Sequence, residues 1–176
     1  RSLVEFPPLR HALEVDAGGF HTCAVLDDGS VSCWGWNNRG QLGDNTTTNG
    51  YSPVGVDLGG MMAVEVAAGY SHTCTIMEDG SVRCWGRNDH GQLGDVTGED
   101  SLIPVSVALP GEHKAVALSL GNEHSCAILD NGTLTCWGDG GSGRLGSGDD
   151  SGSNTPVSAI MPENLTAVAV AASEYN

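Results

Sequence analysis

Basic residues, aromatic residues and long apolar runs are all scarce in this sequence of 176 residues. Seven Lys and Arg stand against 22 Asp and Glu, which gives a formal net charge of −15, and only 5% of the residues are aromatic. Because cation–phosphate contacts dominate binding to nucleic acids, this charge makes nucleic acid and chromatin poor candidates as partners. No run of 18 apolar residues occurs, so we predict neither a transmembrane helix nor membrane insertion.

Several functional motifs are also missing. No C-x-x-C spacing occurs, so the cysteines do not indicate a metal site. The match to G-x-G-x-x-G at 141–146 does not follow a strand and open a helix, as a dinucleotide site requires, and we expect no cofactor. The sequence starts with Arg1 and contains no signal peptide. We expect a fragment of a longer chain, and the alternative is a mature product.

A segment of 24 residues occurs three times, at 21–44, 72–95 and 124–147. Marker residues keep the same spacing throughout: Cys23, Cys74 and Cys126 lie 51 and 52 residues apart. Self-similarity at such a period indicates a repeat architecture in which neighbouring units stack. The predicted division is the end of a preceding unit at 1–11, repeats at 12–62, 63–114 and 115–166, and the start of a further unit at 167–176.

Each repeat contains about four short runs rich in Val, Ile, Thr and Ala, bounded by Gly, Asp or Pro, which is typical of strands. In the second repeat these runs are 63–68, 72–77, 81–85 and 104–109. We therefore predict an all-β protein: a β-propeller segment of about three four-stranded blades. Because closed propellers have four to eight blades, we expect the polypeptide to continue on both sides. The alternative is that several copies share a ring or a filament.

The hairpin in each repeat predicts a disulfide. Glu78-Asp79-Gly80 suits a three-residue hairpin loop, and counting back from it places Cys74 opposite Cys84. Opposed residues of a non-hydrogen-bonded pair lie about 4.5 Å apart at Cα, within reach of a disulfide. The predicted pairs are Cys23–Cys33, Cys74–Cys84 and Cys126–Cys136. They favour an oxidising compartment over a reduced cytosolic protein with free thiols.

The second repeat reads AAGxxHTCxxxxDGxVxCWGxNxxGQLG from Ala67 to Gly94. This pattern resembles the repeat of the regulator of chromosome condensation family, and the resemblance covers essentially the whole chain. It implies a propeller, usually of seven blades, in which the repeat histidines His21, His72 and His124 serve packing and hydrogen bonding. The cysteine pair departs from the nuclear members and is similar to the secreted ones, which implies an extracellular or cell-surface location.

Three Asn-x-Ser/Thr sequons, at Asn45, Asn131 and Asn164, fall in predicted loops or turns and are candidate N-glycosylation sites. The loops after the Gln-Leu-Gly motif vary most between repeats. Their carboxylates at 95–100 and 149–150 could hold a hard cation weakly, but we favour solvated turn residues. Together with the cysteines, the sequons predict a secreted glycoprotein.

No nucleophile–base pair, metal cluster or carboxylate dyad emerges, so we predict no catalytic and no metal-binding residues. The leading hypothesis is a non-enzymatic extracellular module: a structural or protein- or glycan-binding scaffold, such as part of a cell-surface layer, appendage or fibre. Its partners would be other proteins, copies of itself, or glycans.

Two other hypotheses remain open. The resemblance also implies a regulatory binder or inhibitor of an enzyme or GTPase, because one family member exchanges nucleotide on a small GTPase and another inhibits β-lactamase. An enzyme with its site in the central channel is the third reading, but the predicted second and third inner strands offer only Glu65 and Ser119 as polar groups.

Overall fold

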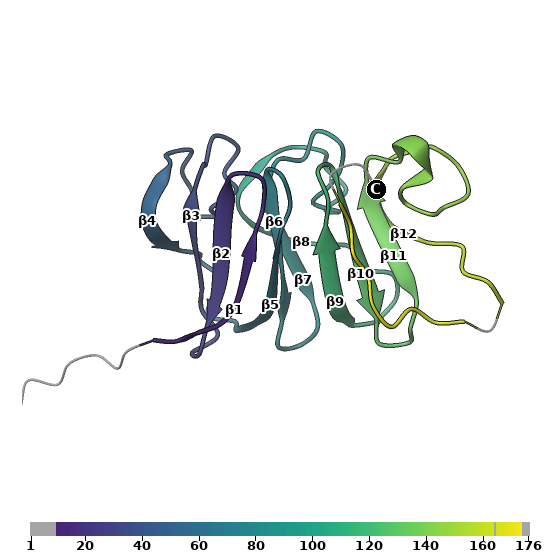
Figure 1. Cartoon of the computed structure of the whole chain (residues 1–176), viewed down its shortest axis with the longest axis horizontal. Helices are drawn as coiled ribbons and strands as arrows, with labels where there is room; N and C mark the ends of the chain where they lie inside the picture. The colour runs from purple at the N-terminus through teal and green to yellow at the C-terminus, as the bar shows by residue number, and fades with distance from the viewer. Residues whose placement is uncertain (1–9, 164, 174–176) are drawn as a thin grey trace, which may run out of the picture.

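Three four-stranded antiparallel sheets follow one another along the chain and stand side by side as propeller blades (Figure 1). The computed structural model describes residues 10–163 and 165–173. The first blade contains β1 (Ala12–Ala17), β2 (His21–Leu26), β3 (Val31–Gly35) and β4 (Gly50–Gly55). The second contains β5 (Ala63–Ala68), β6 (His72–Met77), β7 (Val82–Gly86) and β8 (Ser101–Ser106). The third contains β9 (Ala115–Leu120), β10 (His124–Leu129), β11 (Leu134–Gly138) and β12 (Ser153–Ser158), with a short 3-10 helix, η1 (Gly141–Gly143), before β12.

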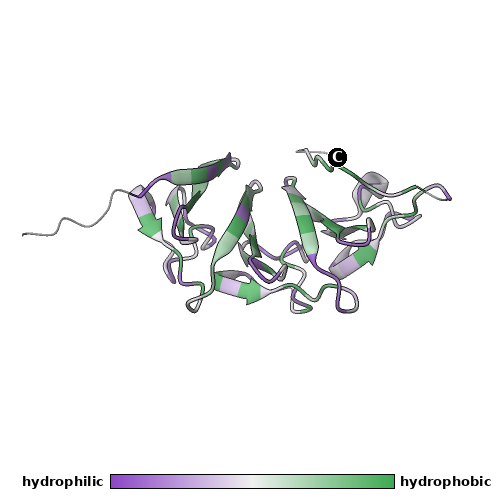
Figure 2. Cartoon of the chain, turned by 90° about the horizontal axis from the view of Figure 1, so that it is seen from below, coloured by the Kyte–Doolittle hydropathy of each residue, from purple (hydrophilic) through white to green (hydrophobic). Residues whose placement is uncertain are grey.

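The strands of each blade are ordered as they are in the sequence. The prediction of an all-β propeller segment with three four-stranded blades is therefore confirmed. Seen along the strands, the blades form an arc with β1, β5 and β9 on its concave side (Figure 2). Within the described part of the chain, no helix has the length and apolar character needed to span a bilayer.

The hairpins of the second and third strands have the turn chemistry that their sequences indicate. In the first blade, Gly29 has φ +74°, and the Asp28 carboxylate accepts hydrogen bonds from the backbone and side chain of Ser30. This turn sets the register that brings Cys23 opposite Cys33. The structure forms one disulfide in each blade, with Cα–Cα distances of 4.1, 4.0 and 4.1 Å, at Cys23–Cys33, Cys74–Cys84 and Cys126–Cys136.

The outer strand of the second blade departs from the prediction. We expected it at 104–109, but β8 begins three residues earlier, at Ser101, and ends at Ser106. Pro104 therefore lies inside the strand and does not start it. β8 is an edge strand that pairs with β7 alone, and its register with β7 shifts between Cys84 and Gly86. A proline without an N–H is tolerated at such an irregular edge.

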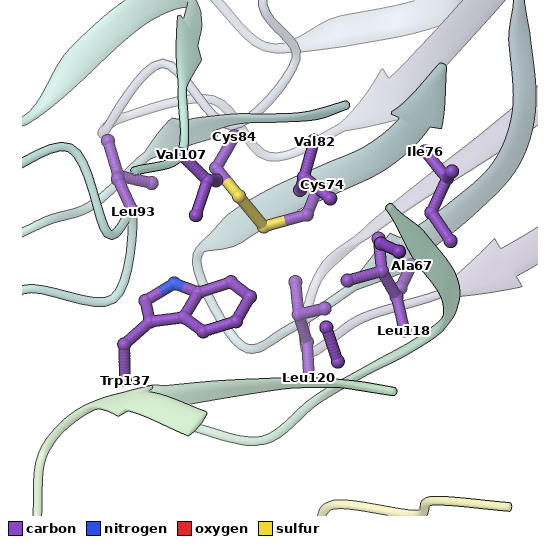
Figure 3. Close-up of a cluster of buried hydrophobic side chains, with 12 residues drawn as sticks. Ala67, Cys74, Ile76, Val82, Cys84, Leu93, Val107, Leu118, Leu120 and Trp137 are labelled. Carbon is purple, nitrogen blue, oxygen red and sulfur yellow. A yellow bond between two sulfur atoms is a disulfide. The ribbon is translucent and has the colours of Figure 1, made fainter. Parts of the chain in front are cut away.

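The apolar core lies between blades. The Trp137 ring of the third blade lies beside the Cys74–Cys84 disulfide of the second, next to Leu93 and Val107 (Figure 3). A matching cluster joins the first blade to the second, with Trp85 as its fully buried aromatic side chain. A single blade could not bury these faces, so each blade depends on its neighbours.

The described part of the C-terminal segment lies against the third blade as β9 lies against the second. The Ala167 N–H donates to Gly132 O at 3.0 Å, just as Ala115 N–H donates to Gly80 O at 2.9 Å. The Ala172 N–H donates to the Ser119 hydroxyl at 2.8 Å. Of the predicted end of a preceding unit at 1–11, residues 1–9 lie outside the described residues.

The disulfides should contribute measurably to stability. Replacing Cys74 and Cys84 by Ala together is expected to lower the free energy of unfolding by about 2–3 kcal/mol, because the bond closes a short loop and restricts the unfolded chain. Urea unfolding of the oxidised protein and of the variant measures the difference. Unreduced and reduced wild-type protein with equal unfolding curves would contradict a stabilising role for the disulfides.

Candidate interaction surface on the loop face

A hydrogen-bond arrangement that recurs at the blade junctions explains the repeat histidines and tryptophans and the hydroxyl residue that follows the histidine. The Gln41 carbonyl of the first blade accepts hydrogen bonds from the Thr73 hydroxyl and the Trp85 indole N–H of the second, both at 2.9 Å. His21 Nε2 lies 2.7 Å from the same Thr73 oxygen. Because the Thr73 proton is directed to Gln41, His21 must donate a hydrogen bond from Nε2.

The second junction repeats the first. The Gln92 carbonyl accepts from the Ser125 hydroxyl and the Trp137 indole, both at 2.9 Å, and His72 Nε2 lies 2.9 Å from Ser125 Oγ. A Cβ on Gly69 would come within 2.3 Å of the His72 ring, so glycine leaves room for the histidine. His21 and His72 therefore hold blades together, as the resemblance implied.

Burial lowers the pKa of both histidines. Loss of solvation brings the pKa of His21 to about 4, against an opposing charge from Asp16. Loss of solvation, with smaller contributions from neighbouring charges, brings the pKa of His72 to about 3. Both rings are therefore neutral near pH 7.

The loop face is the surface formed by residues 18–20, 36–49, 69–71, 87–100, 121–123 and 139–152, which lie along the upper edge in Figure 1. A buried asparagine organises its long loop in the first blade. Asn37 Nδ2 donates to Asp44 Oδ1 at 3.0 Å and to the Thr46 and Thr48 carbonyls, while its Oδ1 accepts from Leu42 N–H. Asn88 repeats the arrangement in the second blade with Asp95, Glu99 and Leu93. These loops are thus held rigidly above the sheets.

Three aromatic rings gather on the loop face, and we call Phe20, Trp36 and Tyr70 the aromatic cluster. Phe20 lies between the other two, with ring centroids 5.2 Å from Trp36 and 5.4 Å from Tyr70, both edge to face. Phe20 is 55% exposed and Trp36 is 36% exposed. Sequence reasoning missed the cluster, because its members come from two different blades.

Charged side chains meet on the loop face between the second and third blades, where Arg87 stands at the position equivalent to Trp36. Arg87 bonds to Glu123 at 2.8 Å and forms an ion pair with Asp89 at 2.7 Å. The His90 ring lies 3.5 Å from the same Glu123 oxygen. The loop face therefore presents an aromatic surface beside a polar, charge-paired one.

Three half-buried carboxylates line the concave side of the blades, and we call Glu14, Asp16 and Glu65 the acidic groove. One oxygen of each carboxylate accepts a hydrogen bond from a backbone N–H of the next inner strand, at 2.9, 2.8 and 2.7 Å respectively. Burial raises the pKa of Glu65, with further contributions from the charges of Glu14 and Asp16, while the Leu118 N–H opposes the shift. Glu65 thus links the second blade to the third, and Ser119 links the third blade to the C-terminal segment.

The candidate glycosylation sites fall at different places. Asn45 is exposed on the loop face, and Asn131 is exposed in the β10–β11 hairpin on the opposite face, where its Oδ1 accepts from Thr133 N–H. Asn164 lies outside the described residues. The loop carboxylates considered for a cation are engaged locally: Asp95 accepts from Thr97 and Asn88, and Asp100 from Asn88 N–H and Arg39.

Family models of the "Regulator of chromosome condensation (RCC1) repeat" match residues 13–41, 63–92 and 115–144, and also 28–76 and 79–128. The Ultraviolet-B receptor UVR8 of Arabidopsis thaliana is 33% identical over 88% of this chain, and human E3 ubiquitin-protein ligase HERC2 is 33% identical over 81%. The chain spans 34% of the length of UVR8 and 3% of that of HERC2. The crystal structure of Prp20p from Saccharomyces cerevisiae superposes with a TM-score of 0.82 at 23% identity, over 94% of this chain and 42% of Prp20p.

The neutral histidines should make stability depend on pH. As the pH falls from 6.5 to about 4.5, the unfolded chain takes up protons on His21 and His72 that the folded chain rejects. The free energy of unfolding should therefore fall by up to about 1.4 kcal/mol per pH unit for each histidine within this window, and level off above pH 6.5.

Urea unfolding at pH 7.0, 6.0 and 5.0 measures this slope. His72→Gln should reduce the slope relative to the wild type, and Asn38→Gln, which changes an exposed uncharged side chain outside the junctions, should leave it unchanged. The same slope in the wild type and in His72→Gln would show that this ring does not control the pH response.

Proposed function

Because this chain belongs to the regulator of chromosome condensation (RCC1) repeat family, we propose that it is a non-enzymatic, extracellular binding module built on a β-propeller. The observation that carries the extracellular assignment is the disulfide in every blade. Disulfides persist in oxidising environments and are rare in the cytosol and nucleus. The formal charge of −15 favours solubility and suits a cationic partner.

A binding role is supported by the relatives and by the loop face. The published description of Prp20p concerns its binding to Gsp1p and histones, and UVR8 is a receptor. HERC2 is a ligase, but the match spans 3% of it, so its catalytic activity is not proposed for these repeats. Rigid blades carry loops that differ from repeat to repeat, an arrangement that commonly serves recognition.

In this proposal the partners are proteins of the cell surface or surroundings, with copies of this chain and glycans as further candidates. The module acts as a scaffold within a surface layer, appendage or fibre. N-linked glycans at Asn45 and Asn131 are compatible with it, because both side chains are exposed. Asn164 remains a candidate from its sequence alone.

A regulatory binder of a single enzyme or GTPase is the second candidate function. The observation that favours it is the compact combination of the aromatic cluster with the Arg87–Glu123 pair on one face, which could fit one specific surface. Such a binder would form a complex of fixed stoichiometry with an enzyme. A scaffold would instead bind surface proteins or glycans.

The thiol state of the protein from its natural source tests the extracellular assignment. We expect iodoacetamide to modify none of the six cysteines before reduction and all of them afterwards, as read by intact mass. Glycosidase should lower the mass if the sequons carry glycan, and Asn45→Gln and Asn131→Gln should each remove one glycan. Six cysteines that react without reduction would overturn the extracellular assignment.

Affinity capture by the oxidised wild-type protein tests the binding role. The scaffold proposal expects extracellular proteins or glycans among the bound species, identified by mass spectrometry and confirmed with purified components. A single enzyme bound at fixed stoichiometry would instead favour the regulator. Turnover of a substrate by the purified module would contradict both.

A further inference from the structure

The aromatic cluster is not required by blade packing. The three repeats allow an internal comparison, because equivalent positions of the same fold carry different residues. Phe20 is replaced by Ser71 in the second repeat and Glu123 in the third, and Trp36 by Arg87 and Asp139. Tyr70 is replaced by Gly19 and Asn122. The fold therefore accepts polar or small residues at every position of the cluster, and the exposed rings of Phe20 and Trp36 point to binding.

The backbone holds the rings together. Trp36 N–H donates to Phe20 O at 2.9 Å, and Gly19 N–H donates to Gly69 O at 3.1 Å, so the loops of the first two blades are tied. A Cβ on Gly19 would lie 2.7 Å from the Tyr70 ring, so glycine lets Tyr70 pack close. The cluster is thus preorganised, and aromatic groups of this kind often dominate binding energy at interfaces.

The surface beside the cluster continues into the acidic groove. A depression lined by Gly18, Gly19, Gly69 and Tyr70 shares Ala17 and Ala68 with the depression lined by the three carboxylates. Glu65 and Tyr70 are five residues apart, and because β5 ends at Ala68 their Cα atoms are separated by less than the about 17 Å that five fully extended residues would span. An extended peptide of about five residues could therefore contact both ends.

The charges of this surface select its partner. Among the described residues that line the two depressions there is no Lys, Arg or His to neutralise the three carboxylates. Aromatic rings attract cations over their faces. A second copy of this chain would bring the same net charge of −15, so charge opposes self-association here.

We propose that the aromatic cluster and the acidic groove together bind an extended, Lys- or Arg-rich segment of a partner protein. This inference rests on the proposed binding function and names the partner chemistry of that same surface. Cationic side chains lie along Glu14, Asp16 and Glu65, and an arginine or lysine stem packs on the exposed ring of Phe20 and the half-buried ring of Tyr70.

Fluorescence anisotropy with a labelled nona-arginine peptide tests the proposal. We expect saturable binding by the oxidised protein at low salt, weakened as salt rises. Phe20→Ser combined with Tyr70→Asn, which introduces residues that other repeats carry there, should weaken binding by about tenfold. The triple variant Glu14→Gln, Asp16→Asn, Glu65→Gln should weaken binding to a similar extent.

Matched controls separate this surface from general acidity. Tyr51→Ala removes a ring that is 98% exposed outside the cluster, and Glu78→Gln, Glu112→Gln, Asp150→Asn together remove three exposed carboxylates elsewhere. Both controls should bind like the wild type. Equal weakening by the two triple variants would overturn the proposal, because it would mean unspecific charge attraction, and so would the absence of peptide binding.

The failure of this inference can be told apart from failure of the proposed function. If a partner captured by the wild-type protein binds equally well to the Phe20→Ser, Tyr70→Asn variant and to the groove variant, the binding function stands and this surface is not its site. A partner or glycan that binds these rings without needing the carboxylates also overturns the cationic assignment. Dimerisation lost with the aromatic variant would identify a second copy as the occupant instead.

Discussion

A backbone carbonyl at each blade junction organises this protein. The Gln41 and Gln92 carbonyls each receive an indole N–H and a hydroxyl from the next blade, and a neutral histidine supports that hydroxyl. Because these polar groups are fully buried, leaving any of them unpaired would cost free energy. Hydrogen bonding and apolar packing therefore demand the same geometry: the tryptophan that reaches the carbonyl also covers the disulfide of the preceding blade.

With the junctions constrained in this way, the loop face is free to vary. An aromatic cluster lies between the first and second blades, whereas between the second and third Arg87, at the position equivalent to Trp36, pairs with Glu123. In the third repeat Gly140 and Arg144 stand where the second has Asn88 and Gln92, and Arg144 pairs with Asp139 at 3.1 Å. One rigid frame thus presents different chemistry from repeat to repeat, as a recognition scaffold requires.

The inner strands combine stability with charge. Their carboxylates hydrogen-bond to the neighbouring strand, so they help to hold the arc, while nothing basic in the described lining of the groove balances them. The disulfides support the proposed extracellular location, and the acidity and the rings support the proposed binding of cationic protein segments.

The sequence by itself determined the repeat period, the four-stranded units, the hairpin register and the cysteine pairs, because each depends on local turn chemistry or on a pattern seen three times. Only the tertiary structure decided which groups meet across blades. Phe20 and Tyr70 belong to different repeats, as do Glu14 and the Val66 N–H that it binds, and no local pattern encodes such contacts. The start of β8 was also missed, because an edge strand admits proline where pairing is irregular. The packing and hydrogen-bonding role of the junction histidines was expected from the resemblance, but the hydroxyl that each contacts, and the carbonyl to which that hydroxyl donates, were identified only in the stacked blades.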